Sequence, residues 1–121
     1  MISVGIDVVA VDRFAATLAR TPAVARRLFN PDEQLTPTGH PRGPASLAAR
    51  FAVKEAVAKA LGVPTGMDWH HCRVLSESSG RPVLEVIGTV AAAAAALGVT
   101  HWRVSVSHDA GVAAAVVIAL G

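Results

Sequence analysis

The stretch that most constrains this chain of 121 residues is a run from Leu47 to Leu61 whose apolar residues fall on all sides of a helix. A surface helix has one apolar stripe, so a run that is apolar all round indicates a helix buried in the interior. Ser46 can cap its start and Gly62 can end it in a left-handed conformation. The sequence therefore predicts a central helix of about four turns, around which the other elements pack.

Four charged residues interrupt this helix, in two pairs spaced four residues apart: Arg50 with Lys54, and Glu55 with Lys59. Residues at this spacing share one edge of a helix, so Glu55 and Lys59 can form an ion pair on a solvated edge. A functional role is the alternative, because charges in a mostly buried helix must find each other, a metal or a ligand.

The remaining chain alternates between strand and helix patterns. Residues 2–9 predict a strand whose bulky apolar face (Ile2, Val4, Ile6 and Val8) packs on the core and whose opposite face carries Asp7. Short helices are expected over residues 12–20 and 22–29, followed by a proline- and glycine-rich loop at 36–45. Two hairpins, 71–77 with 82–87 and 101–107 with 112–119, flank an alanine-rich helix at 89–97. This order predicts a single α+β domain over residues 1–121, with an antiparallel sheet packed around the central helix.

Composition narrows the classes of function. Hydrophobic residues make up 52% of the chain and charged residues only 17%, so part of the apolar surface is expected to close a subunit interface. A net charge of +2, with two Trp, three Phe and no Tyr, is too mild for a nucleic-acid binder. We expect a cytoplasmic protein with no membrane contact, because no apolar run could span a bilayer and no basic leader precedes the first strand. The single cysteine, Cys72, permits no internal disulfide.

A cluster of like charges follows the first strand. The segment from residue 13 to residue 27 carries four arginines and no acid: Arg13, Arg20, Arg26 and Arg27. A solvated face is the ordinary interpretation of such a set. A helix face of one charge sign with small residues also suits an acidic partner helix.

Two carboxylates are the main candidates for chemistry. The chain lacks nucleophile and zinc motifs, and His70 and His71 would point to opposite faces of a strand. Asp7 and Glu55 remain, together with Lys59, Arg50 and His108. Two carboxylates without a third protein ligand suit Mg²⁺, which keeps water ligands and completes its shell with substrate phosphates. Lys59, one turn from Glu55, can hold the same phosphates.

Several motifs occur in a recognisable order. They are Gly5-Ile6-Asp7, Asp12-Arg13-Phe14, the run from Arg50 through Lys54-Glu55-Ala56 to Gly62, Gly80-Arg81-Pro82, and Val104 to His108. Together they resemble the holo-[acyl carrier protein] synthases, the short single-domain 4'-phosphopantetheinyl transferases. The resemblance runs from residue 3 to about residue 118, and it implies the transferase fold and transfer of the phosphopantetheine arm of coenzyme A to a serine of acyl carrier protein. Adenosine 3',5'-bisphosphate would be released, and the carrier would serve fatty-acid or polyketide synthesis.

The resemblance also implies roles for residues. Asp7, Glu55 and Lys59 would be catalytic, with Asp7 and Glu55 as Mg²⁺ ligands. Coenzyme A would be bound by Arg50, Lys59, Gly62, Gly80, Arg81, Pro82, Ser107 and His108. Carrier proteins are acidic helical bundles, so Arg13, Arg20, Arg26 and Arg27 would face the carrier. The base for the carrier serine stays open between Glu33, Asp109 and a Mg²⁺-bound water, and we favour the water or a carboxylate acting through it.

We expect a homotrimer with active sites between subunits, because one small sheet and one central helix offer too little wall for an elongated charged ligand. By resemblance, one subunit would supply Asp7, Glu55 and Lys59, and its neighbour the turn at 80–82 with Ser107 and His108. Two other functions are compatible with the residues alone. One is a non-catalytic oligomeric binding module for an acidic helical partner. The other is a Mg²⁺-dependent enzyme that acts on a different nucleotide diphosphate.

Overall fold

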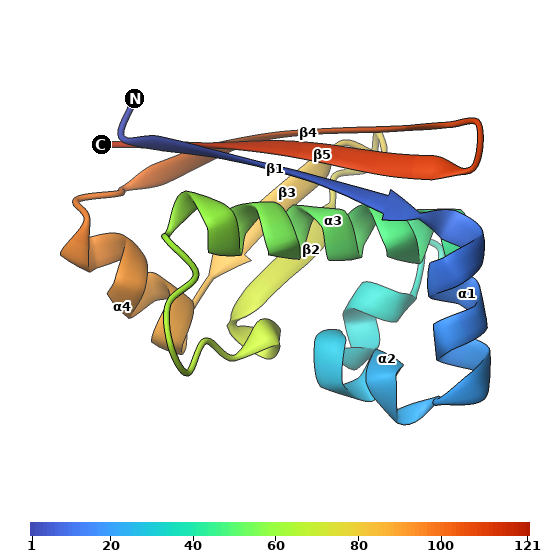
Figure 1. The fold of residues 1–121 in the computed structure, drawn as a ribbon. Coiled ribbons are helices and arrows are strands. Elements are labelled where there is room, and N and C mark those ends of the chain that lie inside the picture. The colour runs from blue at the N-terminus through green and yellow to red at the C-terminus, as the bar shows by residue number, and fades with distance from the viewer.

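Helix α3 (Pro44–Ala60) runs through the middle of the computed structural model, which describes residues 1–121 (Figure 1). A three-stranded antiparallel sheet in the order β1, β5, β4 covers one side of α3, and β2 and β3 pair as a separate two-stranded sheet. The predicted α+β class with antiparallel sheets is confirmed. The elements in chain order are β1 (Ser3–Ala10), α1 (Val11–Arg20), α2 (Ala23–Leu28), the 3₁₀ helix η1 (Pro31–Gln34), α3, the 3₁₀ helix η2 (Trp69–His71), β2 (Cys72–Ser76), β3 (Pro82–Val86), α4 (Gly88–Ala96), β4 (His101–Asp109) and β5 (Val112–Leu120).

The ends of α3 were only half predicted. The helix begins at Pro44 after an extended Gly43, so Ser46 lies inside the first turn and the prediction that it caps the helix is wrong. The rigid φ of Pro44 suits a first helical position, which starts the helix earlier than expected. Gly62 does end the helix in a left-handed conformation with φ of 78°. The next amide, of Val63, donates to the carbonyl oxygen of Ala58 at 2.7 Å, as in a Schellman ending.

Strand β1 presents the opposite face to the one predicted. Val4, Ile6 and Val8 are 52%, 62% and 62% exposed, whereas Gly5 is buried against α3. A Cβ on Gly5 would lie 1.8 Å from the carbonyl oxygen of Ala56. Only small residues permit so close an approach of strand and helix, so the bulky side chains point away from the core and Asp7 points toward the helix side.

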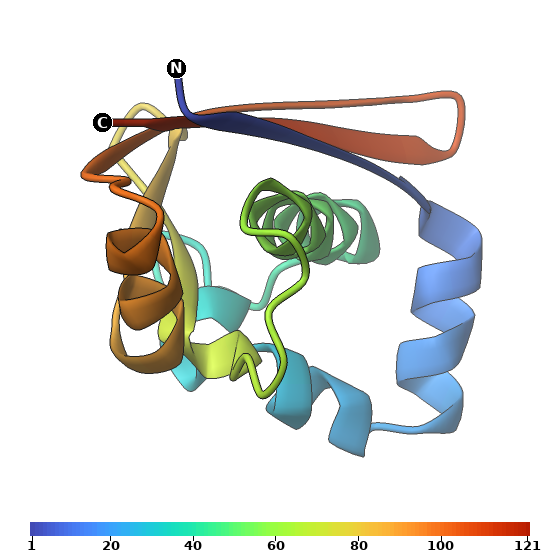
Figure 2. The ribbon, with the colours of Figure 1, turned by 60° about the vertical axis from the view of Figure 1, so that its left-hand side comes forward.

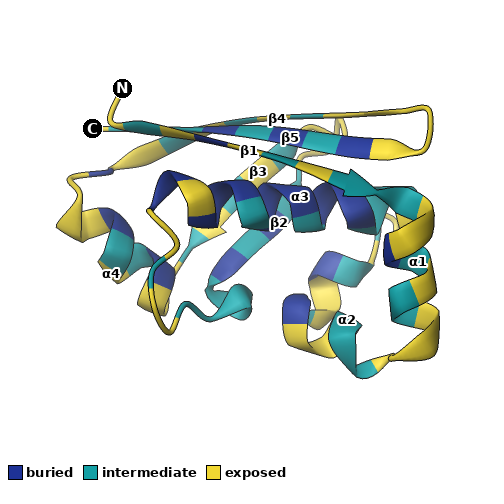
Figure 3. Ribbon diagram, in the orientation of Figure 1, coloured by how far each residue is buried: buried dark blue, intermediate teal, exposed yellow.

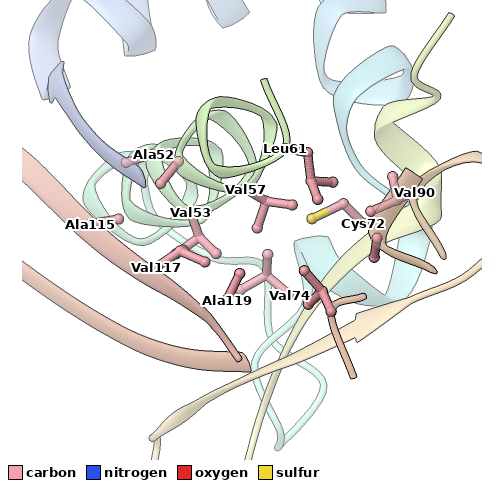
Figure 4. Packing of buried hydrophobic residues seen from close by; sticks show 13 residues of the cluster. Ala52, Val53, Val57, Leu61, Cys72, Val74, Val90, Ala115, Val117 and Ala119 are labelled. Atoms are coloured by element: carbon pink, nitrogen blue, oxygen red, sulfur yellow. The ribbon is translucent and has the colours of Figure 1, made fainter. Parts of the chain in front are cut away.

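The core forms where α3 meets the small residues of β5 and the inner face of β2 (Figure 4). Val53, Val57, Val74 and Val117 have at most 1% of their surface exposed. Cys72 is also fully buried there, and burial raises the pKa of its thiol to about 12. That thiol stays protonated and serves as a small apolar packing residue.

A second cluster joins the helical arm α1–α2 to the start of α3. Phe14 stacks on Phe51 with ring centroids 5.0 Å apart, and it meets Phe29 edge-on at 6.4 Å. The outer faces of this arm are exposed (Figure 3). None of the helices has the length and apolar character needed to cross a membrane.

Candidate active site

Lys59 makes its ion pair with strand β1. Its Nζ donates to Asp7 Oδ1 at 2.9 Å and to the carbonyl oxygen of Ile6 at 3.0 Å. The ion pair between Glu55 and Lys59, one of the two interpretations that the spacing allows, does not form. The reason is tertiary, because β1 packs directly on α3 and offers Lys59 a carboxylate with better geometry than the one a turn away.

Glu55 has no hydrogen bond or ion pair, although it lies beside this pair. Burial, and secondarily the negative charge of Asp7, raise the pKa of Glu55, while Lys59 opposes the shift. Two carboxylates that repel each other and share a single lysine form a site short of positive charge. Such a site favours a divalent cation, and no cluster of three His, Cys, Asp or Glu side chains offers another metal site in the chain.

Both carboxylates line an open cavity of about 390 Å³ whose remaining wall is mainly apolar. Helices α1 and α2 and the first half of α3 supply that wall, and Arg13 borders it. The end of β1 also contributes, and the other lining residues are Val8, Val9, Ala10, Phe14, Thr17, Val24, Leu28 and Phe51. An apolar pocket beside an acidic site can receive an apolar side chain of a partner while the chemistry takes place at its edge.

The four arginines of α1 and α2 are all exposed, and none forms an ion pair. They are Arg13, Arg20, Arg26 and Arg27. Because no acid of this chain pairs with them, the arm α1–α2 keeps a basic surface, and Arg13 brings that charge to the cavity.

A second positively charged site lies at the start of α3. The sequence indicated Arg50 as part of it but not Arg42. Arg42 and Arg50 both donate to Ser46 Oγ, at 3.1 and 3.2 Å, and both donate to Ser76 Oγ. Burial and then the charge of Arg42 lower the pKa of Arg50 to about 10, although Glu33 opposes the shift. The buried Nε of Arg50 has no partner. Two guanidinium groups that converge without a direct carboxylate partner form a ready anion site.

Glu33 occupies a different environment from the one expected of a base. It is 1% exposed, and its carboxylate accepts from Lys54 Nζ, from Asn30 and from the amide of Val74. A carboxylate that is enclosed and saturated with donors cannot reach a carrier serine. The structure thus argues against Glu33 as the base.

The turn at 80–82 and the end of β4 lie away from Asp7. Arg81 and Pro82 line a groove of about 480 Å³ between β3 and β4. His108 and Asp109 lie at the hairpin tip, in a cavity of about 420 Å³ beside Ala45. Figure 2 looks along α3, with α1 on one side, β2 and β3 on the other, and β1 passing over the helix between them. Arg81 and Pro82 therefore lie on the β3 side of the central helix, His108 and Asp109 lie beside the start of α1, and none of the four lines the cavity of Asp7 and Glu55.

The sequence predicts His70 and His71 on a strand, and this prediction is wrong. They belong to η2, and both contact Asp68, at 3.2 and 3.6 Å. His70 also bonds the carbonyl oxygen of Arg26 at 2.5 Å, and the ring Nδ1 of His71 bonds Thr89. These contacts join α2 and α4 to the loop before β2.

The site thus brings Asp7 of β1 beside Glu55 and Lys59 of α3, and residues 3–117 of the chain match the 4'-phosphopantetheinyl transferase superfamily. The chain belongs to this superfamily. The holo-[acyl-carrier-protein] synthase of Streptomyces avermitilis is 64% identical over 121 residues, covering 100% of this chain and 98% of that protein. The enzyme of the same name from Salinispora arenicola is 57% identical over 119 residues and covers 98% of both chains.

Among solved structures, the fold resembles holo-[acyl-carrier-protein] synthase from Helicobacter pylori in complex with coenzyme A. The TM-score is 0.83 at 27% identity, and the alignment covers 97% of this chain and 99% of that one.

Proposed function

We propose that this protein transfers the 4'-phosphopantetheine group of coenzyme A to a serine of apo acyl carrier protein and releases adenosine 3',5'-bisphosphate. The observation that carries the proposal is the meeting of Asp7, Glu55 and Lys59 at the edge of an apolar pocket, in a chain that is 64% identical to a holo-[acyl-carrier-protein] synthase. In this reaction the serine oxygen bonds to the phosphorus next to the pantetheine arm. The bond from that phosphorus to the bridging oxygen breaks, and the leaving bisphosphate takes the electron pair.

Asp7 and Glu55 fit a Mg²⁺ ion, because they supply oxygen ligands from two elements and Glu55 lacks any partner of its own. When bound, Mg²⁺ would neutralise charge on the diphosphate and on the leaving group. Lys59 is half exposed and lies on Asp7, so its long side chain can turn from that carboxylate to a phosphate oxygen. Asp109, exposed at the end of β4, stays a candidate for the base that accepts the serine proton.

The arginine pair suits the third phosphate of coenzyme A. Two of its phosphates form the diphosphate, which belongs with the site of Asp7, Glu55 and Lys59. The phosphate on the ribose is the remaining anion, and Arg42, which lines a cavity with Ser76, offers it a cationic site with Arg50 behind the shared serine. Arg42 is a coenzyme A contact that the sequence did not indicate.

We propose a homotrimer in which each active site lies between two subunits. Arg81, Pro82 and His108 do not line the cavity of Asp7 and Glu55 in one chain, so a neighbour would supply them to each site. The exposed apolar face formed by Val4, Ile6 and Val8 of β1, together with Ile2 just before it, supports this assembly because a monomer would leave it in water. The cytoplasmic location expected from the sequence remains a prediction.

The carrier would dock on the basic arm α1–α2. An acidic helix can pair with Arg13 and Arg20 while one of its apolar side chains enters the neighbouring pocket. This arrangement would bring a serine at the end of the carrier helix to the edge where Asp7 and Glu55 lie.

A direct experiment incubates the protein with coenzyme A, Mg²⁺ and an apo carrier protein and then weighs the carrier. We expect its mass to increase by one phosphopantetheine group, and adenosine 3',5'-bisphosphate to accumulate in equal amount. A carrier that binds but keeps its mass would instead indicate a non-catalytic binding module. Turnover of another nucleotide diphosphate with no change in the carrier would indicate a different Mg²⁺-dependent enzyme.

Mixing tests the shared site. After reversible dissociation, Glu55→Gln protein is combined with a His108→Ala, Arg81→Ala double variant, each inactive alone. Recovery of activity in mixed oligomers is expected, because some sites then pair two intact halves. A monomer in sedimentation at assay concentration would contradict the assembly.

A further inference from the structure

An ion pair is completely enclosed on the side of α3 that faces β2. Lys54 Nζ lies 2.9 Å from Glu33 Oε1, and both side chains have 0% of their surface exposed. The ammonium also donates to the carbonyl oxygens of Trp69 at 3.0 Å and Cys72 at 2.6 Å. All three of its N–H donors are therefore used inside the protein.

The carboxylate of Glu33 is equally well occupied. Its Oε1 accepts from the amide and side-chain nitrogens of Asn30, at 2.8 and 2.9 Å, and its Oε2 accepts from the amide of Val74 at 2.8 Å. Glu33 thus fixes η1 to α3 and to β2. A buried pair of this kind seldom exceeds an apolar pair in stability, so its value is to be sought in what it holds in place.

The segment fixed by Glu33 holds Arg42. The carbonyl oxygen of Glu33 accepts from Arg42 Nε at 3.1 Å, and the carbonyl oxygen of Gln34 accepts from the amide of Arg42 at 2.9 Å. The far end of the guanidinium reaches Ser46 and Ser76, which Arg50 also contacts. Two guanidinium groups repel each other, and an arginine on a loop gains rotamer freedom when it turns into solvent. A rigid support is needed to keep Arg42 beside Arg50.

We infer that the Glu33–Lys54 pair is a positioning device that holds Arg42 against Arg50 as a preformed site for the ribose phosphate of coenzyme A. The inference rests on the proposed function, since it assumes that this phosphate binds the arginine pair. Lys54 and Glu33 touch neither substrate in this account, and they act through η1 and Arg42.

The test compares coenzyme A with 3'-dephospho-coenzyme A, which lacks only the ribose phosphate. The ratio of the two kcat/KM values does not depend on how much of a variant is folded, so loss of stability alone leaves it unchanged. We expect the wild type to prefer coenzyme A and Glu33→Gln to reduce that preference by about tenfold, the effect of weakening one charge-assisted contact. Glu85→Gln, whose carboxylate pairs with Arg73 at the surface and does not line the cavity of Arg42, is the matched control and should keep the wild-type ratio.

Epistasis sharpens the result. Arg42→Ala should reduce the preference by a similar factor, and combining it with Glu33→Gln should reduce it little further, because both remove the same placement. If Glu33→Gln gives too little folded protein, Asn30→Ala removes one donor to Glu33, and calorimetry measures its binding of adenosine 3',5'-bisphosphate. Weaker binding than wild type is expected.

Two outcomes separate the inference from the function on which it rests. A Glu33→Gln or Asn30→Ala protein that is less stable but keeps the full preference and the full bisphosphate affinity would overturn the positioning role. A wild type that transfers phosphopantetheine equally well from both donors would overturn the placement of the ribose phosphate on the arginine pair.

Discussion

Helix α3 carries two lysine–carboxylate pairs whose lysines are five residues apart, and the pairs have the same length and opposite surroundings. Lys54 and Glu33 are 2.9 Å apart with 0% of either side chain exposed. Lys59 and Asp7 are also 2.9 Å apart, but 49% of the lysine and 15% of the aspartate side chain are exposed. The first pair has every donor occupied, whereas the second lies beside a carboxylate with no partner.

This difference in exposure distinguishes an ion pair with a structural role from one that can take part in the reaction. Enclosed charges that are saturated with hydrogen bonds cannot exchange partners without large cost. A half-exposed lysine can leave its carboxylate because water compensates it. We therefore assign the Lys54 pair to fixing the structure and the Lys59 pair to exchange with metal and phosphate, a distinction that the two distances alone would not reveal.

The largest effect is expected at the exchangeable site. Asp7→Ala and Glu55→Gln should each lower kcat by about a thousandfold or more, because one carboxylate cannot hold a metal against the water that surrounds it. Their thermal unfolding should stay close to that of the wild type. Steady-state transfer in saturating Mg²⁺ measures the loss, and near-normal turnover in either variant would remove that residue from the metal site.

The next largest effect is a difference in stability between variants of the two lysines. Lys54→Met should lower the free energy of unfolding by about 3 to 5 kcal/mol, because it leaves the buried carboxylate of Glu33 unpaired. Lys59→Met should cost about 1 kcal/mol or less, since its partner can be hydrated. Urea denaturation of both variants gives the two values. Equal losses would mean that exposure does not distinguish these pairs.

Local patterns in the sequence were sufficient to predict the helices and strands. They were not sufficient to predict which face of strand β1 packs on the core. The periodicity of residues 47–61 and the turn residues between strands predicted α3 and both hairpins, because these signals are local. Ile6 was assigned to the core because it is bulky and apolar. The strand instead packs through Gly5, since a close approach to Ala56 excludes side chains, and this constraint appears only when the helix is in place.

The sequence predicted the acidic residues of the candidate site but not the side chains that contact them. Asp7 and Glu55 were noticed because acids are unusual in apolar segments. Lys59 was matched with Glu55, four residues away, although its partner is 52 residues away. The sequence does not indicate Arg42, because it lies in a loop rich in proline and glycine. It leaves Glu33 among the candidates for the base, because the burial of Glu33 depends on β2 and α3. Contacts across the fold carry this information, and no local pattern contains it.

A smaller effect is expected on the affinity for Mg²⁺ of the protein without coenzyme A. Lys59 occupies an oxygen of Asp7 and repels a dication, so Lys59→Met should tighten Mg²⁺ binding to the free protein by about tenfold, even as turnover falls. Lys59→Arg keeps the charge and serves as control. Calorimetry with Mg²⁺ alone measures the affinity. Unchanged or weaker binding in Lys59→Met would show that this lysine does not compete for the metal site.

The basic arm should respond mainly in its carrier kinetics. Reversing Arg20 to Glu is expected to raise the KM for the carrier several-fold and to weaken its dependence on salt, because a rim charge sets encounter and is screened. The KM for coenzyme A should hardly change, since Arg20 lines neither the cavity of Asp7 and Glu55 nor that of Arg42. Equal increases in both KM values would mean that the arginine serves the fold or the nucleotide.

The smallest effect is a pH-dependent gain of stability in an inactive variant. Burial and the charge of Asp7 raise the pKa of Glu55 in the folded protein, so folding favours its neutral form. That contribution is fully present below the unfolded value of about 4.3 and is lost as pH rises through the higher folded value. Gln cannot ionise, so Glu55→Gln should unfold at a slightly higher temperature than the wild type at pH 8 without metal, by an amount worth about 1 kcal/mol or less because water screens this partly exposed group. The gain should vanish near pH 4, where both side chains are neutral, and it should reverse when saturating Mg²⁺ stabilises only the wild type. Thermal unfolding of both proteins across this pH range, with and without Mg²⁺, gives the comparison; a constant difference at every pH would mean that Glu55 affects stability through packing and not through its charge.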